Sequence, residues 1–238
     1  MPITLAHPAA VLPMRRYCPR FLSFPALVIG SLTPDIAYVF GKANVDEFSH
    51  RLVGSVGFCL PVGLLVVWVF YGLRFPVVRF LPARLRRILL PLCQRPLASP
   101  GIVVVSLLVG ACTHIFLDSL THKDGWLVGL LPVLQIAAAS MGTQTLRIHL
   151  VVWYVASFVG VAWLFLVFQR WQEVAAGLSA RTSDIVKWGN AVVVALLVLP
   201  VASLHHLARP PPAFRFIAVL ALLAAMGFVL RVAGLSNK

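Results

Sequence analysis

Three side chains that commonly bind metal ions follow one another at intervals of four residues in an apolar segment: His114, Asp118 and His122. In an α-helix a step of four residues rotates the side chain by only about 40° beyond a full turn, so the three would lie on one stripe. Imidazole and carboxylate groups at this spacing can bind one cation. Ionisable groups in such apolar segments are rare and usually functional. The stripe therefore predicts a metal site.

His122 has a separate set of interpretations. It follows His114 by eight residues, which is about 12 Å along a helix and too far to share one ion. His122 therefore serves a second ion, transfers protons, or caps the carboxyl end of the helix, where His is favourable. For His114 and Asp118 the alternative to a metal site is an ordinary hydrogen bond between membrane helices.

Composition places the chain among membrane proteins. Of its 238 residues, 60% are hydrophobic and 11% are charged, which is typical of a polytopic membrane protein. The four Cys residues have no paired spacing, so neither a disulfide framework nor a Cys-based zinc site is expected. The formal net charge is +13, but six Arg fill one loop, Arg74–Arg95, between apolar segments. This distribution indicates a cytoplasmic loop that meets anionic lipid, and it excludes a nucleic-acid partner.

Hydropathy predicts an all-α bundle with five membrane spans, because five apolar stretches reach the roughly 20 residues that a spanning helix needs. A further apolar segment, Phe21–Phe40, is interrupted by proline and glycine. We expect it to be a re-entrant or interfacial piece or a sixth membrane segment. The chain is then one integral membrane domain, 1–238, with the candidate metal-site half in 1–125 and three further membrane helices in 145–238. The predicted spans are Leu52–Leu73, Gly101–Leu120, Ile148–Phe168, Ile185–Leu204 and Phe214–Val232.

The predicted topology places two more candidate metal ligands near His114 and Asp118. If the Arg-rich loop is cytoplasmic, the start of the first span and the end of the second share the extracytoplasmic face. Asp35 and His50 then lie at the same face as His114 and Asp118. Asp35 could instead only mark a helix start after Pro34, and His50 could be a hydrogen-bonded residue at the membrane boundary.

Four short motifs add a family resemblance. Along essentially its full length the chain resembles domain-of-unknown-function family 4184, a family of bacterial integral membrane proteins. The resemblance implies a location in the bacterial inner (plasma) membrane. The motifs that carry it are Thr-Leu-Ala-His-Pro-Ala-Ala at 4–10, Gly-Ser-Leu-Thr-Pro-Asp at 30–35, Ser-His-Arg at 49–51 and Thr-His-x-x-x-Asp at 113–118.

A more remote resemblance concerns the polar residues of the first half. They are similar to those of membrane-bound metal-dependent hydrolases and, through them, of zinc-dependent phospholipase C and P1-type nucleases. This resemblance implies a divalent metal, zinc, held by Asp35, His50, His114 and Asp118. It also implies that Asp118 bridges toward a second ion that His7 binds.

The chain departs from the soluble enzymes at two places. The soluble enzymes have a further His-x-x-x-Glu pair, whereas here Trp153 follows His149 by four residues. Their amino-terminal Trp ligand is also missing, although His122 could partly substitute. His7 can share a face with the other candidates only if Phe21–Phe40 re-enters the membrane instead of crossing it.

The remote resemblance, together with a polar site near the membrane face, implies hydrolysis of a phosphoester bond in a lipid or lipid-linked substrate. The metal would activate water, and His122 is the candidate acid or base. Two alternatives stay open. The same polar residues could serve a non-enzymatic transporter or metal-binding membrane protein, or they could only join the helices of a structural membrane protein.

Overall fold

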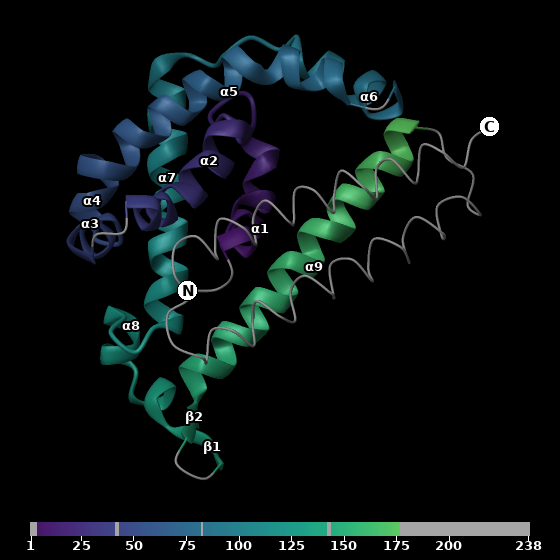
Figure 1. The fold of residues 1–238 in the computed structure, drawn as a ribbon. Coiled ribbons are helices and arrows are strands. Elements are labelled where there is room, and N and C mark those ends of the chain that lie inside the picture. The colour runs from purple at the N-terminus through teal and green to yellow at the C-terminus, as the bar shows by residue number, and fades with distance from the viewer. Residues whose placement is uncertain (1–3, 41–42, 82, 142–143, 177–238) are drawn as a thin grey trace. The chain divides into compact units, whose positions relative to one another are not determined.

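The computed structural model describes residues 4–40, 43–81, 83–141 and 144–176 (Figure 1). Two compact units make up the chain. The first comprises Met1–Tyr71 and Leu97–Leu164, and the second comprises Gly72–Pro96 and Phe165–Lys238. The predicted fourth and fifth spans lie outside the described residues. All candidate metal ligands belong to the first unit.

Three helical stretches in the described part of the chain are long and apolar enough to cross a membrane: Leu52–Phe80, Pro100–Thr121 and Ile148–Trp171. They coincide with the first three predicted spans, and the protein is mostly helical, as expected. The first stretch consists of α4 (Leu52–Gly54), one π-helical turn (Ser55–Cys59) and α5 (Leu60–Phe80). The second is α7 (Pro100–Thr121), and the third lies in α9 (Ile148–Ala176).

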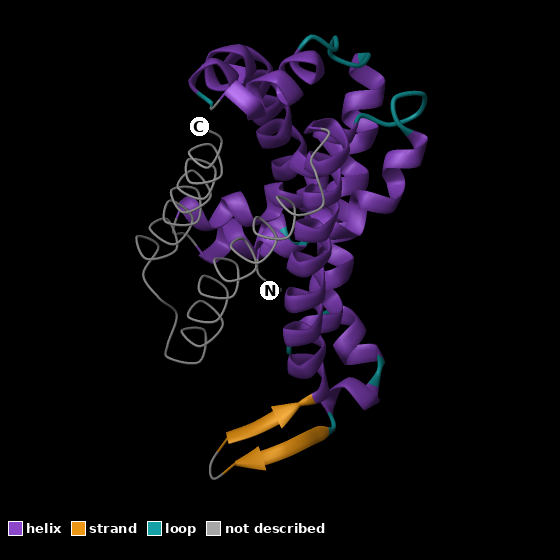
Figure 2. Ribbon diagram, turned by 90° about the vertical axis from the view of Figure 1, so that its right-hand side faces the viewer, coloured by secondary structure: helices purple, strands orange, loops and turns teal. Residues whose placement is uncertain are grey.

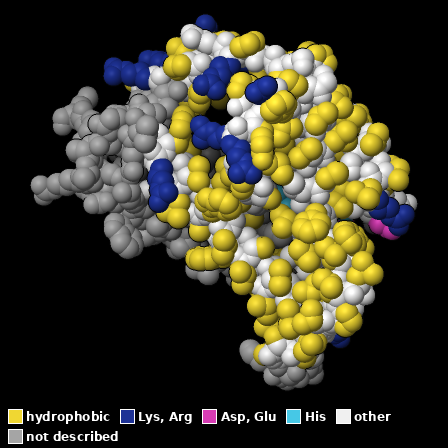
Figure 3. Space-filling model, turned by 180° about the vertical axis from the view of Figure 1, so that it is seen from behind, with side chains coloured by type: hydrophobic (Ala, Val, Ile, Leu, Met, Phe, Trp, Pro, Cys, Tyr) yellow, Lys and Arg dark blue, Asp and Glu magenta, His cyan; other side chains and the backbone are white. Residues whose placement is uncertain are grey.

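Large apolar side chains cover much of the outer surface of these helices. Trp68 on α5 is 73% exposed and Phe158 on α9 is 70% exposed. Figure 3 shows hydrophobic side chains over most of the visible described face, with Lys and Arg gathered in a few places. Soluble monomers rarely expose so much contiguous apolar surface. The exposure therefore agrees with helices that contact lipid.

Helix α2 (Phe24–Ile36) is too short to cross a bilayer. Its 13 residues measure about 20 Å, against a hydrocarbon thickness of about 30 Å. Pro34 lies in its last turn, and a 3-10 turn (Ala37–Phe40) follows. Before it come short turns, including α1 (Pro8–Val11), which packs against both α2 and α7. The chain thus leaves the region of His7 and returns to it through α2.

Helices α2 and α7 pack against each other (Figure 1), and each carries a glycine at the contact. A Cβ atom on Gly30 would lie 2.3 Å from the Leu107 carbonyl oxygen, and one on Gly110 would lie 2.4 Å from that of Leu27. Small residues allow such an approach between membrane helices. The Ser23 amide also donates a 2.8 Å hydrogen bond to Ser106 Oγ. This packing fixes the end of α2 against the polar half of α7.

Shorter elements complete the two units. In the first, α3 (Ala43–Ser49) precedes α4, and α8 (Trp126–Leu130) follows α7. Strands β1 (Ala137–Met141) and β2 (Gln144–Arg147) then form an antiparallel hairpin (Figure 2), which the sequence analysis did not predict. In the second unit, α6 (Ala83–Cys93) lies in the Arg-rich loop.

Candidate metal centre

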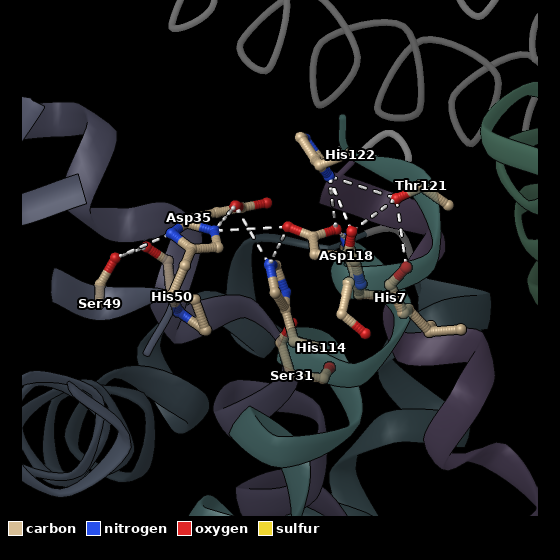
Figure 4. Close-up of polar contacts among 12 residues, drawn as sticks. His7, Ser31, Asp35, Ser49, His50, His114, Asp118, Thr121 and His122 are labelled. Atoms are coloured by element: carbon tan, nitrogen blue, oxygen red, sulfur yellow. Dashed lines mark hydrogen bonds and ion pairs between the residues drawn. The ribbon is translucent and has the colours of Figure 1, made fainter. Parts of the chain in front are cut away.

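Five side chains from separate parts of the first unit converge on one point (Figure 4). His7 directly precedes α1, Asp35 belongs to the last turn of α2, and His50 follows α3. His114 and Asp118 lie one turn apart on α7. All are buried except His50, which is half-buried. The structure thus brings together the five residues that the remote resemblance implied as metal ligands.

Four distances between imidazole nitrogens and carboxylate oxygens of the cluster are nearly equal. Asp35 Oδ1 lies 3.4 Å from His50 Nε2 and 3.4 Å from His114 Nε2. Asp118 Oδ2 lies 3.5 Å from His50 Nε2 and 3.4 Å from His114 Nε2. Charge-assisted hydrogen bonds are shorter, about 2.7–2.9 Å. Ligand atoms at about 2.0–2.1 Å from a tetrahedral zinc ion, by contrast, are about 3.3–3.4 Å apart. The spacing fits the ligands of an ion better than direct hydrogen bonds.

Backbone carbonyl groups orient the imidazole rings of His50 and His114. His114 Nδ1 is 2.8 Å from the Ser31 carbonyl oxygen, and His50 Nδ1 is 2.8 Å from that of Asp46. A carbonyl oxygen can only accept, so each Nδ1 carries the hydrogen. In a neutral ring Nε2 then presents a lone pair to the carboxylate oxygens, which are acceptors too. Acceptors that face one another need a proton or a cation between them, and metal-bound His commonly has such an outer carbonyl partner.

His7 extends the cluster on the other side of Asp118. Its Nε2 lies 3.5 Å from Asp118 Oδ1, and its ring stacks on His114 with centroids 3.6 Å apart. Burial, reinforced by His114, lowers the pKa of His7 to about 3, so the ring is neutral near pH 7. Asp118 thus directs one oxygen to His7 and the other to His50 and His114. The resemblance to two-metal hydrolases implied such a bridging carboxylate.

Two overlapping triads have ligand atoms that all lie within 4.8 Å of one another: His7 with Asp35 and His114, and His50 with His114 and Asp118. His114 belongs to both. Several polar atoms of the cluster have no hydrogen-bond partner in the described part of the chain. They are His7 Nδ1 and Nε2, both oxygens of Asp35, Nε2 of His50, Nε2 of His114, and Asp118 Oδ1.

The charge balance also favours a cation. Asp35 and Asp118 are 6% and 7% exposed, and only imidazoles lie within ion-pair distance of them among the described residues. Two buried carboxylates without a positive partner are costly. Burial disfavours a charge on His50, yet the Asp35 carboxylate and the Asp46 carbonyl outweigh it and raise the pKa of His50. A proton on His50 would balance one carboxylate, and one divalent ion would balance both.

His122 lies at the edge of this cluster and in neither triad. It caps α7, with Nδ1 3.1 Å from the Asp118 carbonyl oxygen and 4.0 Å from Asp118 Oδ1. Its side chain is 38% exposed, and burial lowers its pKa to about 4. The position agrees with the expectation that His122 cannot share an ion with His114. Capping and proton transfer both remain compatible with it.

Sequence reasoning missed the residues that orient the ligands. The Ser31 carbonyl could not be recognised, because every residue has one. Ser49 is fully buried, and its Oγ lies 3.1 Å from the Pro34 carbonyl, 2.8 Å from the Asp46 carbonyl and 3.1 Å from His50 Nδ1. It joins the segments that carry Asp35 and His50. A small polar residue directly before His50 was the available signal.

In the part of the chain that the structure describes, the fold is mostly helical, with three candidate membrane spans and a buried His/Asp cluster. The chain belongs to the family described as "Domain of unknown function (DUF4184)", whose model matches residues 1–235. This confirms the family resemblance expected from the four motifs. Neither a curated protein nor a solved structure matches the chain. These comparisons do not show the remoter likeness to hydrolases.

Proposed function

We propose that this protein is a metal-dependent hydrolase of the bacterial inner membrane that cleaves phosphoester bonds in lipids or lipid-linked substrates. The observation that carries the proposal is the convergence of imidazole nitrogens and carboxylate oxygens at 3.4–3.5 Å. Asp35, His50, His114 and Asp118 would hold one divalent ion, and His7 with Asp118 would hold a second. The ligand set of two imidazoles and two carboxylates suits zinc.

A divalent ion in such a site polarises a phosphoryl oxygen and activates water. The chain supplies the rest. The Ser31 and Asp46 carbonyl groups hold the His114 and His50 rings in one tautomer. Asp35 and Asp118 provide the negative charge that retains the ion. His122, neutral near pH 7 because burial lowers its pKa, would accept a proton at the exposed edge of the centre.

Placement at membrane depth supports a lipid substrate. His114 and Asp118 lie in the last two turns of the α7 span, and His50 directly precedes the first span. We place this end at the extracytoplasmic face because the Arg-rich loop follows the opposite end of the first span. A phosphoester bond in a lipid headgroup lies at about this depth, whereas a water-soluble substrate needs no site inside a membrane protein.

Metal analysis of the purified full-length protein, combined with a hydrolysis assay, tests the proposal. Wild type should retain at least one divalent ion per chain after gel filtration and release phosphate or headgroup from phospholipid in detergent. Asp118→Asn should lose both properties, whereas Asp124→Asn should keep them, because Asp124 is exposed and lies beside Lys123. Wild type without stoichiometric metal would refute the metal centre. Bound metal without hydrolysis across a broad lipid panel would favour the transporter.

A further inference from the structure

The loop between α7 and α9 carries charged residues only at its two ends, at Lys123, Asp124 and Arg147. From Gly125 to Leu146 the chain has no Asp, Glu, Lys or Arg, although the loop connects the ends of α7 and α9. Loops of this length that face water usually carry charges, and those of membrane proteins carry them in patterns that set orientation. The composition therefore indicates an environment other than bulk water.

The same loop exposes a set of large apolar side chains, which we call the α8 platform. They come from α8 and from the 3-10 turn that follows it, Pro132–Gln135, with its neighbours. Each is between 42% and 68% exposed. Tryptophan is enriched where proteins meet the headgroup region. The members of the platform are Trp126, Leu130, Leu131, Val133 and Ile136.

Buried side chains and hydrogen bonds within the loop fix the position of the α8 platform. Val128 is 1% exposed and Leu134 is 8% exposed, so both point inward from the loop. Gln135 Nε2 donates a 2.9 Å hydrogen bond to the Val128 carbonyl, and the Ile148 amide donates to that of Ile136. Buried side chains and hydrogen bonds therefore fix the backbone that carries the exposed apolar side chains.

The loop also begins next to the metal centre. The Gly125 amide donates a 2.9 Å hydrogen bond to the His122 carbonyl. A Cβ atom on Gly125 would lie 2.3 Å from the carbonyl oxygen of Ser119, so the start of α8 lies directly against the last turn of α7. That turn follows Asp118 immediately. The α8 platform and the cluster are thus parts of one end of the first unit.

We propose that the α8 platform docks into the headgroup and upper acyl region of the bilayer and holds the acyl chains of an amphiphilic lipid whose headgroup reaches the metal centre. The docking follows from the uncharged composition, the exposed apolar side chains and the direct link to two spans. The delivery of a lipid to the cluster rests on the proposed function. A second copy of this chain or another protein could cover the same surface, and the test distinguishes these cases.

Nitroxide labels measure docking without any assay of activity. In a cysteine-free full-length background, Leu130→Cys and Val133→Cys report on the α8 platform, and Asp124→Cys serves as the control in the same loop. The labelled proteins are reconstituted into vesicles of phosphatidylcholine and phosphatidylglycerol. Labels at 130 and 133 should collide more with oxygen, which partitions into lipid, than with a water-soluble nickel complex. The label at 124 should show the reverse.

Two results would overturn docking. If the nickel complex reaches positions 130 and 133 as readily as position 124, the α8 platform faces water. If neither reagent reaches these positions, protein covers the surface, and cross-linking of the labelled chains shows whether a second copy does so. Native circular dichroism of each labelled variant establishes that the fold is kept.

The delivery of lipid is tested by comparing two phosphodiesters, a phospholipid in vesicles and a water-soluble aryl phosphodiester without acyl chains. In the double variant Leu130→Gln/Val133→Gln, the ratio of phospholipid to soluble hydrolysis should fall about tenfold or more, since each burial of such a side chain contributes substantially to apolar binding. Phe21→Gln, an exposed apolar residue elsewhere, should leave the ratio unchanged. If the double variant has the same ratio of phospholipid to soluble hydrolysis as wild type, the α8 platform does not deliver lipid to the metal centre. Wild type that cleaves neither ester would overturn the proposed function and delivery together, while the nitroxide labels still decide docking.

Discussion

The carbonyl oxygen of Ser31 lies 2.8 Å from His114 Nδ1, across the packed helices α2 and α7. The two residues are 83 positions apart in the chain. This contact assigns the hydrogen of His114 to Nδ1 and directs Nε2 toward Asp35 and Asp118. A backbone group of one helix thereby determines how the side chain of another can bind an ion.

The close approach of α2 and α7 should be essential for this orientation. In Gly110→Ala the new methyl group would meet the Leu27 carbonyl at about 2.4 Å, and such overpacking costs about 1–3 kcal/mol. We expect a lower unfolding temperature in detergent and reduced metal content. Gly101→Ala on the same helix has no atom within 4 Å of the new carbon and should behave like wild type. Equal stability of the two variants would contradict the packing argument.

Metal content should distinguish the shared ligand from the others. In the proposed arrangement Asp118 binds both ions, one through each carboxylate oxygen, so Asp118→Ala should abolish binding of any ion. His7→Ala and His50→Ala each remove a ligand of only one ion, and each should retain part of the wild-type metal. Elemental analysis after dialysis against dilute zinc measures the difference. If His7→Ala binds as much metal as wild type, His7 is a packing residue that only stacks on His114.

Metal affinity should fall as the pH decreases. The neighbouring Asp35 carboxylate and Asp46 carbonyl outweigh the effect of burial and raise the pKa of His50, so without an ion the ring keeps its proton to a higher pH than usual. The ion needs the neutral ring and displaces that proton, and affinity therefore rises with pH. Competition with a zinc indicator between about pH 5.5 and pH 8 covers the range in which His titrates. Affinity that does not change over this range would exclude His50 as a ligand.

His122 should contribute to turnover but not to metal retention. It lies outside both triads, so His122→Asn should keep the wild-type metal content. If His122 transfers a proton, hydrolysis should fall by about 10²–10⁴-fold, the usual contribution of a general acid or base. Loss of metal together with activity would assign His122 to a second ion instead. Full activity would leave it the role of a helix cap.

The proposed orientation predicts opposite accessibility of two loops in intact cells. A cysteine-free chain with Asp124→Cys should react with a membrane-impermeant maleimide added from outside, because we place this loop at the extracytoplasmic face. Arg87→Cys, in the Arg-rich loop, should react only after the membrane is permeabilised. The reverse pattern would place the metal centre at the cytoplasmic face and would contradict the assignment of orientation.

Local sequence determined the parts of this protein that depend on composition and helical period. Three predicted spans coincide with α5 and its preceding turns, α7 and α9, because hydropathy acts residue by residue. His114 and Asp118 lie on one face of α7 because four residues are close to one turn. The hairpin of β1 and β2 was missed, since a short strand pair has little signal in an apolar loop. Length along the helix alone predicted that His122 and His114 do not share an ion, and His122 lies in neither triad.

Only the tertiary structure decided how the ligands meet. His7, Asp35 and His50 come from separate elements, and their convergence depends on the return of the chain through α2 and on the contact between α2 and α7 at Gly30 and Gly110. Family resemblance could name these residues but not their distances. The tautomers of His50 and His114 depend on backbone carbonyl groups, which are chemically the same in every residue. Packing decides which carbonyl groups contact the two imidazoles, so the types of the side chains alone cannot identify these carbonyl groups.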